Sequence, residues 1–105
     1  MFSVHPATAD GGQLTLSVAG ELDLNNGYQL HEAVTAALTT PGIRDLVIDL
    51  NDLRFMDSVG ISTLLAGWRQ AHTQGTTFRI VRPTRSVTQI LETTGTLTLL
   101  TGDTP

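Results

Sequence analysis

The spacing of apolar residues changes several times along the chain, and each change predicts a different element. Leu14, Leu16 and Val18 alternate with small or polar residues, which is typical of a strand with one buried face. The turn residues Asp10-Gly11-Gly12 precede this strand, so Phe2 to Val4 is expected to pair with it as a hairpin. The chain is therefore predicted to begin with two antiparallel strands.

An amphipathic helix is predicted after the second strand. A polar loop over residues 21–24 leads to Asn25 or Asn26, either of which is a suitable helix cap because its side chain accepts hydrogen bonds from backbone N–H groups. Apolar residues then recur at the spacing of one helical face: Leu30, Ala33, Val34, Ala37 and Leu38. Pro41-Gly42 is expected to end this helix.

The second half of the chain continues the alternation of strand and helix. Leu46-Val47-Ile48, ending at Asp49-Leu50, is an uninterrupted apolar run, which favours a central, parallel strand buried on both faces. A second helix is predicted from about Asp57-Ser58 to Gln74-Gly75. Its inward positions are expected to be Ile61, Leu64, Leu65 and Trp68.

Three shorter elements complete the pattern. Phe78 and Ile80 predict a strand, and Arg82-Pro83-Thr84 leads into a third helix that Thr93-Thr94-Gly95 closes. The inward residues of that helix are expected to be Val87, Ile90 and Leu91. A last short strand is predicted from Leu97, Leu99 and Leu100. The order β-β-α-β-α-β-α-β predicts an α/β fold with a mixed, mostly parallel sheet of four to five strands.

Composition and charge narrow the classes of function. The 105 residues, 40% apolar and 15% charged, predict one globular domain over residues 1–105, and the lack of cysteine excludes disulfides and thiol catalysis. The net charge is −4 and the six arginines are spread along the chain, so no nucleic-acid partner is expected. No apolar run approaches the ~20 residues of a membrane span, and residues 1–10 do not resemble a signal peptide. We therefore expect a cytoplasmic protein with no membrane partner.

Residues 53–61 contain the most informative candidate site. Asp57 and Ser58 fall between a buried strand and an amphipathic helix, and hence at a helix N-terminus. One interpretation is structural, because Asp and Ser are common caps and Gly60 permits close packing. The other is that Ser58 accepts a phosphate, which would place ~1.5 to 2 negative charges on an exposed helix start. Both interpretations remain open on these residues alone.

No catalytic, cofactor or metal site is predicted. The nucleophile elbow of a hydrolase requires glycine two residues before the serine, where this chain has Met56. Phosphate-binding and metal-binding motifs of the P-loop, GxGxxG and HExxH types do not occur. Phe55 and Trp68 are interpreted as core or near-core residues. The histidines lack the spacing of a metal site or a catalytic base: His5, His31 and His72.

A second candidate segment is Gly20-Glu21-Leu22-Asp23. It is either an ordinary strand-to-helix loop or an acidic rim beside the start of the second helix. Loops that follow parallel strands gather at one edge of a sheet, where functional sites are usually found. Glu21, Asp23 and Asp57 are therefore predicted to form a single partner-facing surface.

These two segments resemble the bacterial anti-sigma factor antagonists of the STAS family, along nearly the whole chain. Gly20-Glu21-Leu22-Asp23 is similar to the family's G-E-[LIV]-D motif. Residues 50–58, Leu-Asn-Asp-Leu-Arg-Phe-Met-Asp-Ser, are similar to its D/N-L-x-x-L-x-F-[MIL]-D-S segment, and Gly60-Ile61 with Leu64-Leu65 fits the helix that follows. The resemblance implies the STAS fold.

The resemblance also implies a function. Such proteins bind an anti-sigma factor that is also a GHKL-type serine kinase, and thereby release a sigma factor. The kinase phosphorylates the serine after the aspartate, here Ser58, and a PP2C-type phosphatase removes the phosphate. Asp23, Asp57, Val59 and Gly60, together with Glu21, are then expected to border the partner contact.

Two features of the chain depart from the family pattern. Val59 occupies a position that is often small or hydroxylated, and the sequence ends at Pro105, before the final helix that many members carry.

Two other hypotheses for the function of the chain compete with this one. One alternative is a STAS-type scaffold or accessory subunit, in a stress-signalling or lipid-transport complex, where Ser58 only caps a helix. Another is a module that binds a small molecule or nucleotide at the strand ends, for which no phosphate cradle is found.

Overall fold

In the computed structural model, residues 1–7 and 11–102 are described. Asp10, which the sequence places in the first turn, lies outside these residues. The helices and strands are β1 (Ser3–Pro6), β2 (Gln13–Leu22), α1 (Gly27–Leu38), β3 (Asp45–Met56), α2 (Ser58–Thr73), β4 (Thr77–Val81), α3 (Arg85–Thr93) and α4 (Leu97–Thr101).

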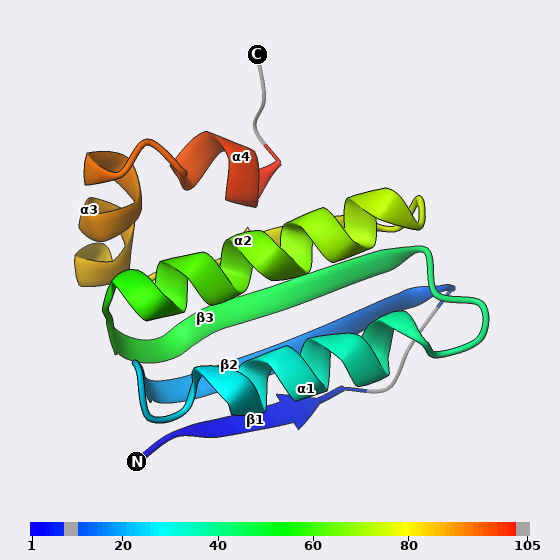
Figure 1. Ribbon diagram of the computed structural model, residues 1–105, viewed down its shortest axis with the longest axis horizontal. Coiled ribbons are helices and arrows are strands. Elements are labelled where there is room, and N and C mark those ends of the chain that lie inside the picture. The colour runs from blue at the N-terminus through cyan, green and yellow to red at the C-terminus, as the bar shows by residue number, and fades with distance from the viewer. Residues whose placement is uncertain (8–10, 103–105) are drawn as a thin grey trace.

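One mixed sheet forms the base of the molecule. Its strand order is β1-β2-β3-β4, with β1 antiparallel to β2 and the other two pairs parallel. The opening hairpin and the parallel pairs are therefore as predicted. Figure 1 shows α1 and α2 running side by side over one face of the sheet. Helix α3 packs against β3, and α4 packs against β4. The molecule is flat as a result, measuring 34 × 33 × 20 Å.

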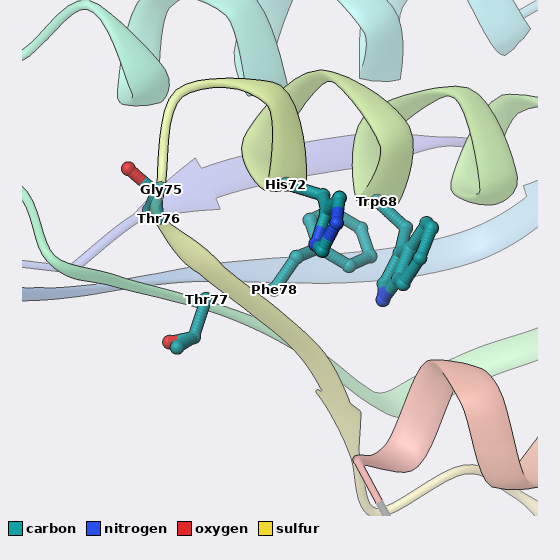
Figure 2. A pocket seen from close by; sticks show the side chains of 6 residues that line it. All are labelled: Trp68, His72, Gly75, Thr76, Thr77 and Phe78. Carbon is teal, nitrogen blue, oxygen red and sulfur yellow. The ribbon is translucent and has the colours of Figure 1, made fainter. Parts of the chain in front are cut away.

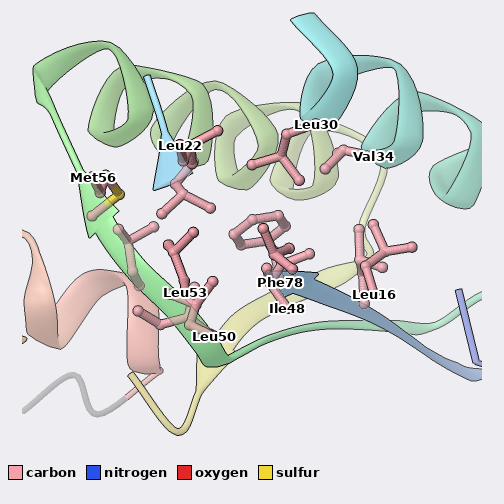
Figure 3. Packing of buried hydrophobic residues seen from close by; sticks show 14 of the residues in the cluster. Leu16, Leu22, Leu30, Val34, Ile48, Leu50, Leu53, Met56 and Phe78 are labelled. Carbon is pink, nitrogen blue, oxygen red and sulfur yellow. The ribbon is translucent and has the colours of Figure 1, made fainter. Parts of the chain in front are cut away.

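The core lies between the sheet and the two long helices (Figure 3). The predicted stripe of α1 is confirmed, because Leu30, Val34, Ala37 and Leu38 are all buried. Residues 46–48 of β3 are buried throughout, as expected for a central strand. Large side chains with less than 2% exposure include Leu16, Leu22, Leu30, Ile48, Leu50, Leu53, Met56 and Leu64.

Strands β2 and β3 extend further than the sequence suggested. The predicted loop over residues 21–24 is half strand, since Glu21 and Leu22 pair with Phe55 and Met56 of β3. Between Ser17 and Glu21 the register shifts twice, and each shift adds one residue to the β3 side. Bulges of this kind bend a strand and increase its twist without ending the pairing. They carry β3 directly to the start of α2.

The prediction of a final strand from Leu97, Leu99 and Leu100 is wrong. These residues form the short helix α4, in which the Leu100 N–H donates to the Thr96 carbonyl. Leu97 and Leu100 are three apart, so both fall on one helical face, and Leu100 is fully buried. The alternation that suggested a strand fits one helical turn equally well over so few residues.

The placement of Phe55 in the core is also wrong. Its side chain is 48% exposed, whereas Trp68 is half-buried against the core as expected. The second β3 bulge lies just before Phe55 and changes which face its side chain takes. Phe55 lines a shallow surface groove with α3 residues that include Gln89 and Ile90.

An ion pair joins β3 to the segment after β4. The Arg82 guanidinium donates to both carboxylate oxygens of Asp49, and these hydrogen bonds hold the pKa of Asp49 below its ordinary value. A carboxyl whose pKa is lowered by folding stabilises the native state above its unfolded pKa, about 3.9, and that contribution is lost as the pH falls through the folded value. The pair should therefore stabilise the protein at neutral pH and cease to do so in acid.

Arg82→Ala should lower the melting temperature at pH 7 by a small amount, since Arg82 is 64% exposed and solvent screens the pair. The deficit relative to wild type should be largest at neutral pH and shrink only below about pH 3.9, as the pH falls through the lowered pKa of Asp49 in the folded wild-type protein. Arg85→Ala is the matched control, an exposed arginine with no ion pair in the described part of the chain. A deficit that is constant with pH would contradict the assignment.

Candidate functional site at the start of helix α2

Asp57 caps helix α2 with its side chain. Its Oδ1 accepts hydrogen bonds from the N–H groups of Val59, at 2.9 Å, and Gly60, at 3.1 Å. Its backbone has the extended conformation of an N-cap, and its carbonyl accepts from the Ile61 N–H. The predicted helix start at Asp57-Ser58 is confirmed. This cap fixes the first turn of α2, which carries Ser58.

Ser58 is the first residue of α2, and its side chain is exposed. Within residues 1–7 and 11–102 its hydroxyl makes no hydrogen bond, and the cap is supplied by Asp57 alone. Two of the N–H groups in this first turn already donate to the Asp57 carboxylate. A group attached to the Ser58 oxygen would therefore point into solvent or toward a partner, with Asp57 beside it.

Gly60 allows the start of α2 to lie directly on the ends of β2 and β3. A Cβ atom at this position would be 2.4 Å from Cγ of Met56 and 3.1 Å from both Cγ and the carbonyl oxygen of Leu22. Both neighbours are fully buried. The absence of a side chain at Gly60 is thus a packing requirement, as the sequence suggested.

The loop from Asp23 to Asn26 is held by its own side chains. The Asp23 carboxylate accepts from the Asn25 N–H, and the Asn26 side chain accepts from the Asp23 N–H and donates to the Glu21 carbonyl. Asn26 occupies the N-cap position of α1 but makes no side-chain cap, so only half of that prediction is confirmed. The loop leaves the Glu21 side chain exposed and Asp23 half-buried.

The two acidic segments lie side by side. The Asp57 N–H donates to the Leu22 carbonyl at 3.2 Å, and Glu21 pairs with Phe55 across the β2–β3 ladder. The chain therefore brings Glu21 and Asp23 next to the segment that carries Asp57, as predicted from the topology of parallel strands. Val59, half-buried, lies on the helix beside them.

A groove of about 440 Å³ runs between α1 and α2, next to the acidic edge that Glu21, Asp23 and Asp57 form. Its lining residues are Leu24, Gly27, Tyr28, His31, Val59, Ser62, Thr63 and Ala66. Leu24 and Tyr28 are 74% and 61% exposed, and neither residue was predicted from the sequence to have a role. The sequence signal that could have identified them is that two large apolar residues lie four positions apart, outside the buried stripe of α1.

A second cleft lies at the opposite end of α2 (Figure 2). The rings of Trp68 and His72 stack there with their centroids 5.0 Å apart, beside Phe78 and the turn through Gly75. No cluster of His, Cys, Asp or Glu in the described residues is arranged to hold a metal ion. None of the helices in that part of the chain is both long and apolar enough to cross a membrane.

The fold and this helix start define a STAS domain. The family model described as Mlab, STAS domain matches residues 6–101, and the chain belongs to this STAS family. Among solved structures, the chain is similar to an anti-sigma factor antagonist from Mycobacterium paratuberculosis. The two are 27% identical with a TM-score of 0.79, over 90% of this chain and 79% of that one.

Two further solved structures share the fold at lower identity. The Bacillus cell fate determinant SpoIIAA in its phosphorylated form is 17% identical with a TM-score of 0.70, over 90% of this chain and 85% of that one. A sulfate transporter family protein from Wolinella succinogenes is 11% identical with a TM-score of 0.76, over 92% and 78%. The same fold is therefore found in proteins of different roles.

Proposed function

We propose that this chain is an anti-sigma factor antagonist, a binding protein rather than an enzyme, which phosphorylation of Ser58 switches off. It binds an anti-sigma factor with GHKL-type serine kinase activity, and a PP2C-type phosphatase restores the active form. The observation that carries the proposal is the exposed Ser58 hydroxyl, which has no hydrogen-bond partner among the described residues and lies on a helix turn fixed by Asp57. The similarity to the mycobacterial antagonist supports the same reading.

The site supplies an acceptor hydroxyl and an adjacent binding surface, with the chemistry left to the kinase. In the transfer, the Ser58 oxygen attacks the γ-phosphorus of ATP, the bond to ADP breaks, and the hydroxyl proton passes to a base on the kinase. The first turn of α2 need not rearrange, because Asp57 rather than Ser58 caps the helix.

Phosphorylation changes the surface more than the fold. The new group carries ~1.5 to 2 negative charges and lies beside the Asp57 carboxylate, which already occupies the Val59 and Gly60 N–H groups. A partner that covers this helix start must remove water from the phosphate, and such desolvation costs several kcal/mol per ion. The phosphoserine also faces the ADP left in the kinase, which is itself an anion. Both effects favour dissociation.

Intact-protein mass spectrometry after incubation with ATP and each anti-sigma kinase encoded in the same genome tests the proposal. Wild type should gain one phosphate and Ser58→Ala none. Ser86→Ala is the matched control, since Ser86 is also exposed and lies in the first turn of a helix, α3, and it should be phosphorylated like wild type. If the folded wild-type protein gains no phosphate with any of the kinases, or if Ser58→Ala still gains one, the proposal fails.

A second candidate is a STAS scaffold or accessory subunit that holds partners together without phosphorylation. The observation in its favour is that the family model carries the name Mlab, and that the fold is shared with a sulfate transporter family protein. In that case Ser58 is only the first residue of a helix. Co-purification in a stable assembly that ATP does not dissociate, with Ser58→Ala behaving like wild type, would favour this function.

A further inference from the structure

We propose that the groove between α1 and α2 is the docking site for a basic surface of the anti-sigma factor that presents an apolar side chain. This inference rests on the proposed function and identifies the chemistry of its partner. The apolar side chain would lie between Leu24 and Tyr28 on one wall and Val59 on the other. Lysine or arginine side chains around it would face the acidic edge.

Large apolar side chains are exposed at this groove. Four such residues in the described part of the chain are strongly exposed: Met1, Leu24, Tyr28 and Phe55. Two of them, Leu24 and Tyr28, border this one groove, whereas Met1 and Phe55 lie elsewhere. Tyrosine is enriched at the energetically important positions of protein interfaces, because it buries a large area and loses few rotamers.

The groove is already formed in the unbound protein. Gly27 brings α1 so close to α2 that a Cβ atom there would be 3.0 Å from the Thr63 hydroxyl oxygen. That hydroxyl donates to the Val59 carbonyl at 2.8 Å and is fixed on α2. Leu24 belongs to the loop that Asp23 and Asn26 hold in place. A preformed surface loses little conformational entropy when a partner binds.

The distribution of charge around the groove favours a basic partner. Residues 21–32 and 57–66 carry four of the ten acidic residues, Glu21, Asp23, Glu32 and Asp57, and none of the six arginines. The remaining six acidic residues are balanced by the six arginines, so these two segments account for the whole net charge of −4. An apolar groove with such a border is complementary to a partner with an apolar residue among basic ones.

The position of Ser58 links the groove to the switch. Ser58 precedes Val59, which lines the groove, and Ser62 lines it one turn later. A phosphate on Ser58 would therefore lie at the border of the apolar contact. A partner could not close over the groove without removing water from the phosphate.

The test measures binding to each anti-sigma factor of the same genome, with a non-hydrolysable ATP analogue so that no phosphate is transferred. Leu24→Ala and Tyr28→Ala should each weaken the complex about tenfold or more, with unchanged melting temperatures because both side chains are exposed. Phe55→Ala, an exposed apolar residue outside the groove, is the control and should bind like wild type. The association rate of wild type should fall as salt is raised.

The outcomes separate this inference from the proposed function. If an anti-sigma factor binds wild type but Leu24→Ala and Tyr28→Ala bind equally well, the docking site is wrong and the proposed function stands. An equal loss in Phe55→Ala would also overturn the assignment to this groove. An association rate that does not depend on salt would exclude a basic partner surface. If no anti-sigma factor binds wild type, the proposed function fails, and the inference with it.

Discussion

In the presence of ATP, the Ser58→Ala variant is expected to remain bound to its anti-sigma factor, whereas wild type dissociates. The variant lacks only the acceptor hydroxyl, which makes no hydrogen bond within the described residues. The Asp57 cap and the first turn of α2 are therefore retained. Without ATP, the two proteins should bind with the same affinity.

The size of the effect follows from the charge that phosphorylation adds. Desolvation of the phosphate at a covered helix start costs several kcal/mol, and every 1.4 kcal/mol changes the dissociation constant tenfold. A weakening of the wild-type complex by about 100-fold or more is expected once it is phosphorylated. Surface plasmon resonance on the purified, mass-verified phosphoprotein measures this directly.

Two variants define the outcome. Ser58→Asp carries one negative charge rather than ~1.5 to 2, and should weaken the complex less than the phosphate does. Ser86→Ala should dissociate on addition of ATP as wild type does. If ATP releases Ser58→Ala and wild type alike, the switch does not act through Ser58.

Much of the fold could be predicted because the apolar periodicity is clear where elements are long. The stripe of α1 and the buried run 46–48 of β3 each repeat a pattern often enough to exclude the other period. The start of α2 could also be predicted, because Asp57 is a favourable cap placed between a buried strand and an apolar helical face. The parallel topology then placed the two acidic segments at one edge of the sheet.

The structural features that could not be predicted from the sequence depend on contacts between residues that are far apart along the chain. The apolar pattern of residues 97–101 is too short to distinguish one helical turn from a strand. The segment forms helix α4, which packs against β4. The exposure of Phe55 follows from a bulge in the β2–β3 register, which local periodicity does not reveal. The groove depends on the close approach of α1 to α2 at Gly27, which joins Leu24 and Tyr28 to Val59 only in three dimensions.

Gly60 affects both the packing of α2 on the sheet and the position of Ser58. It lies two residues after Ser58, and its backbone N–H donates to the Asp57 cap. Beneath it are Met56 and Leu22, the last residues of β3 and β2. The position of the Ser58 hydroxyl relative to the acidic edge therefore depends on how closely this turn can approach the sheet.

Gly60→Ala is expected to destabilise the protein by about 1–3 kcal/mol, as overpacking of a buried site does. Alanine normally stabilises a helix by ~1 kcal/mol relative to glycine, but here its Cβ would lie 2.4 Å from Cγ of the buried Met56. The helix start must move away from β2 and β3, so the rate of Ser58 phosphorylation should fall as well. Denaturant unfolding and a kinase assay on the same preparation measure the two effects.

Two further variants identify the cause of this loss. Ser62→Ala, at an exposed position of the same helix, should change the free energy of unfolding by no more than ~0.5 kcal/mol. Met56→Ala removes the nearest obstacle at the cost of a cavity, so the double variant Gly60→Ala/Met56→Ala should be less destabilised than the sum of its single variants. If Gly60→Ala is instead more stable than wild type, helix propensity outweighs the contact, and the close packing of α2 on the strand ends does not limit the substitution.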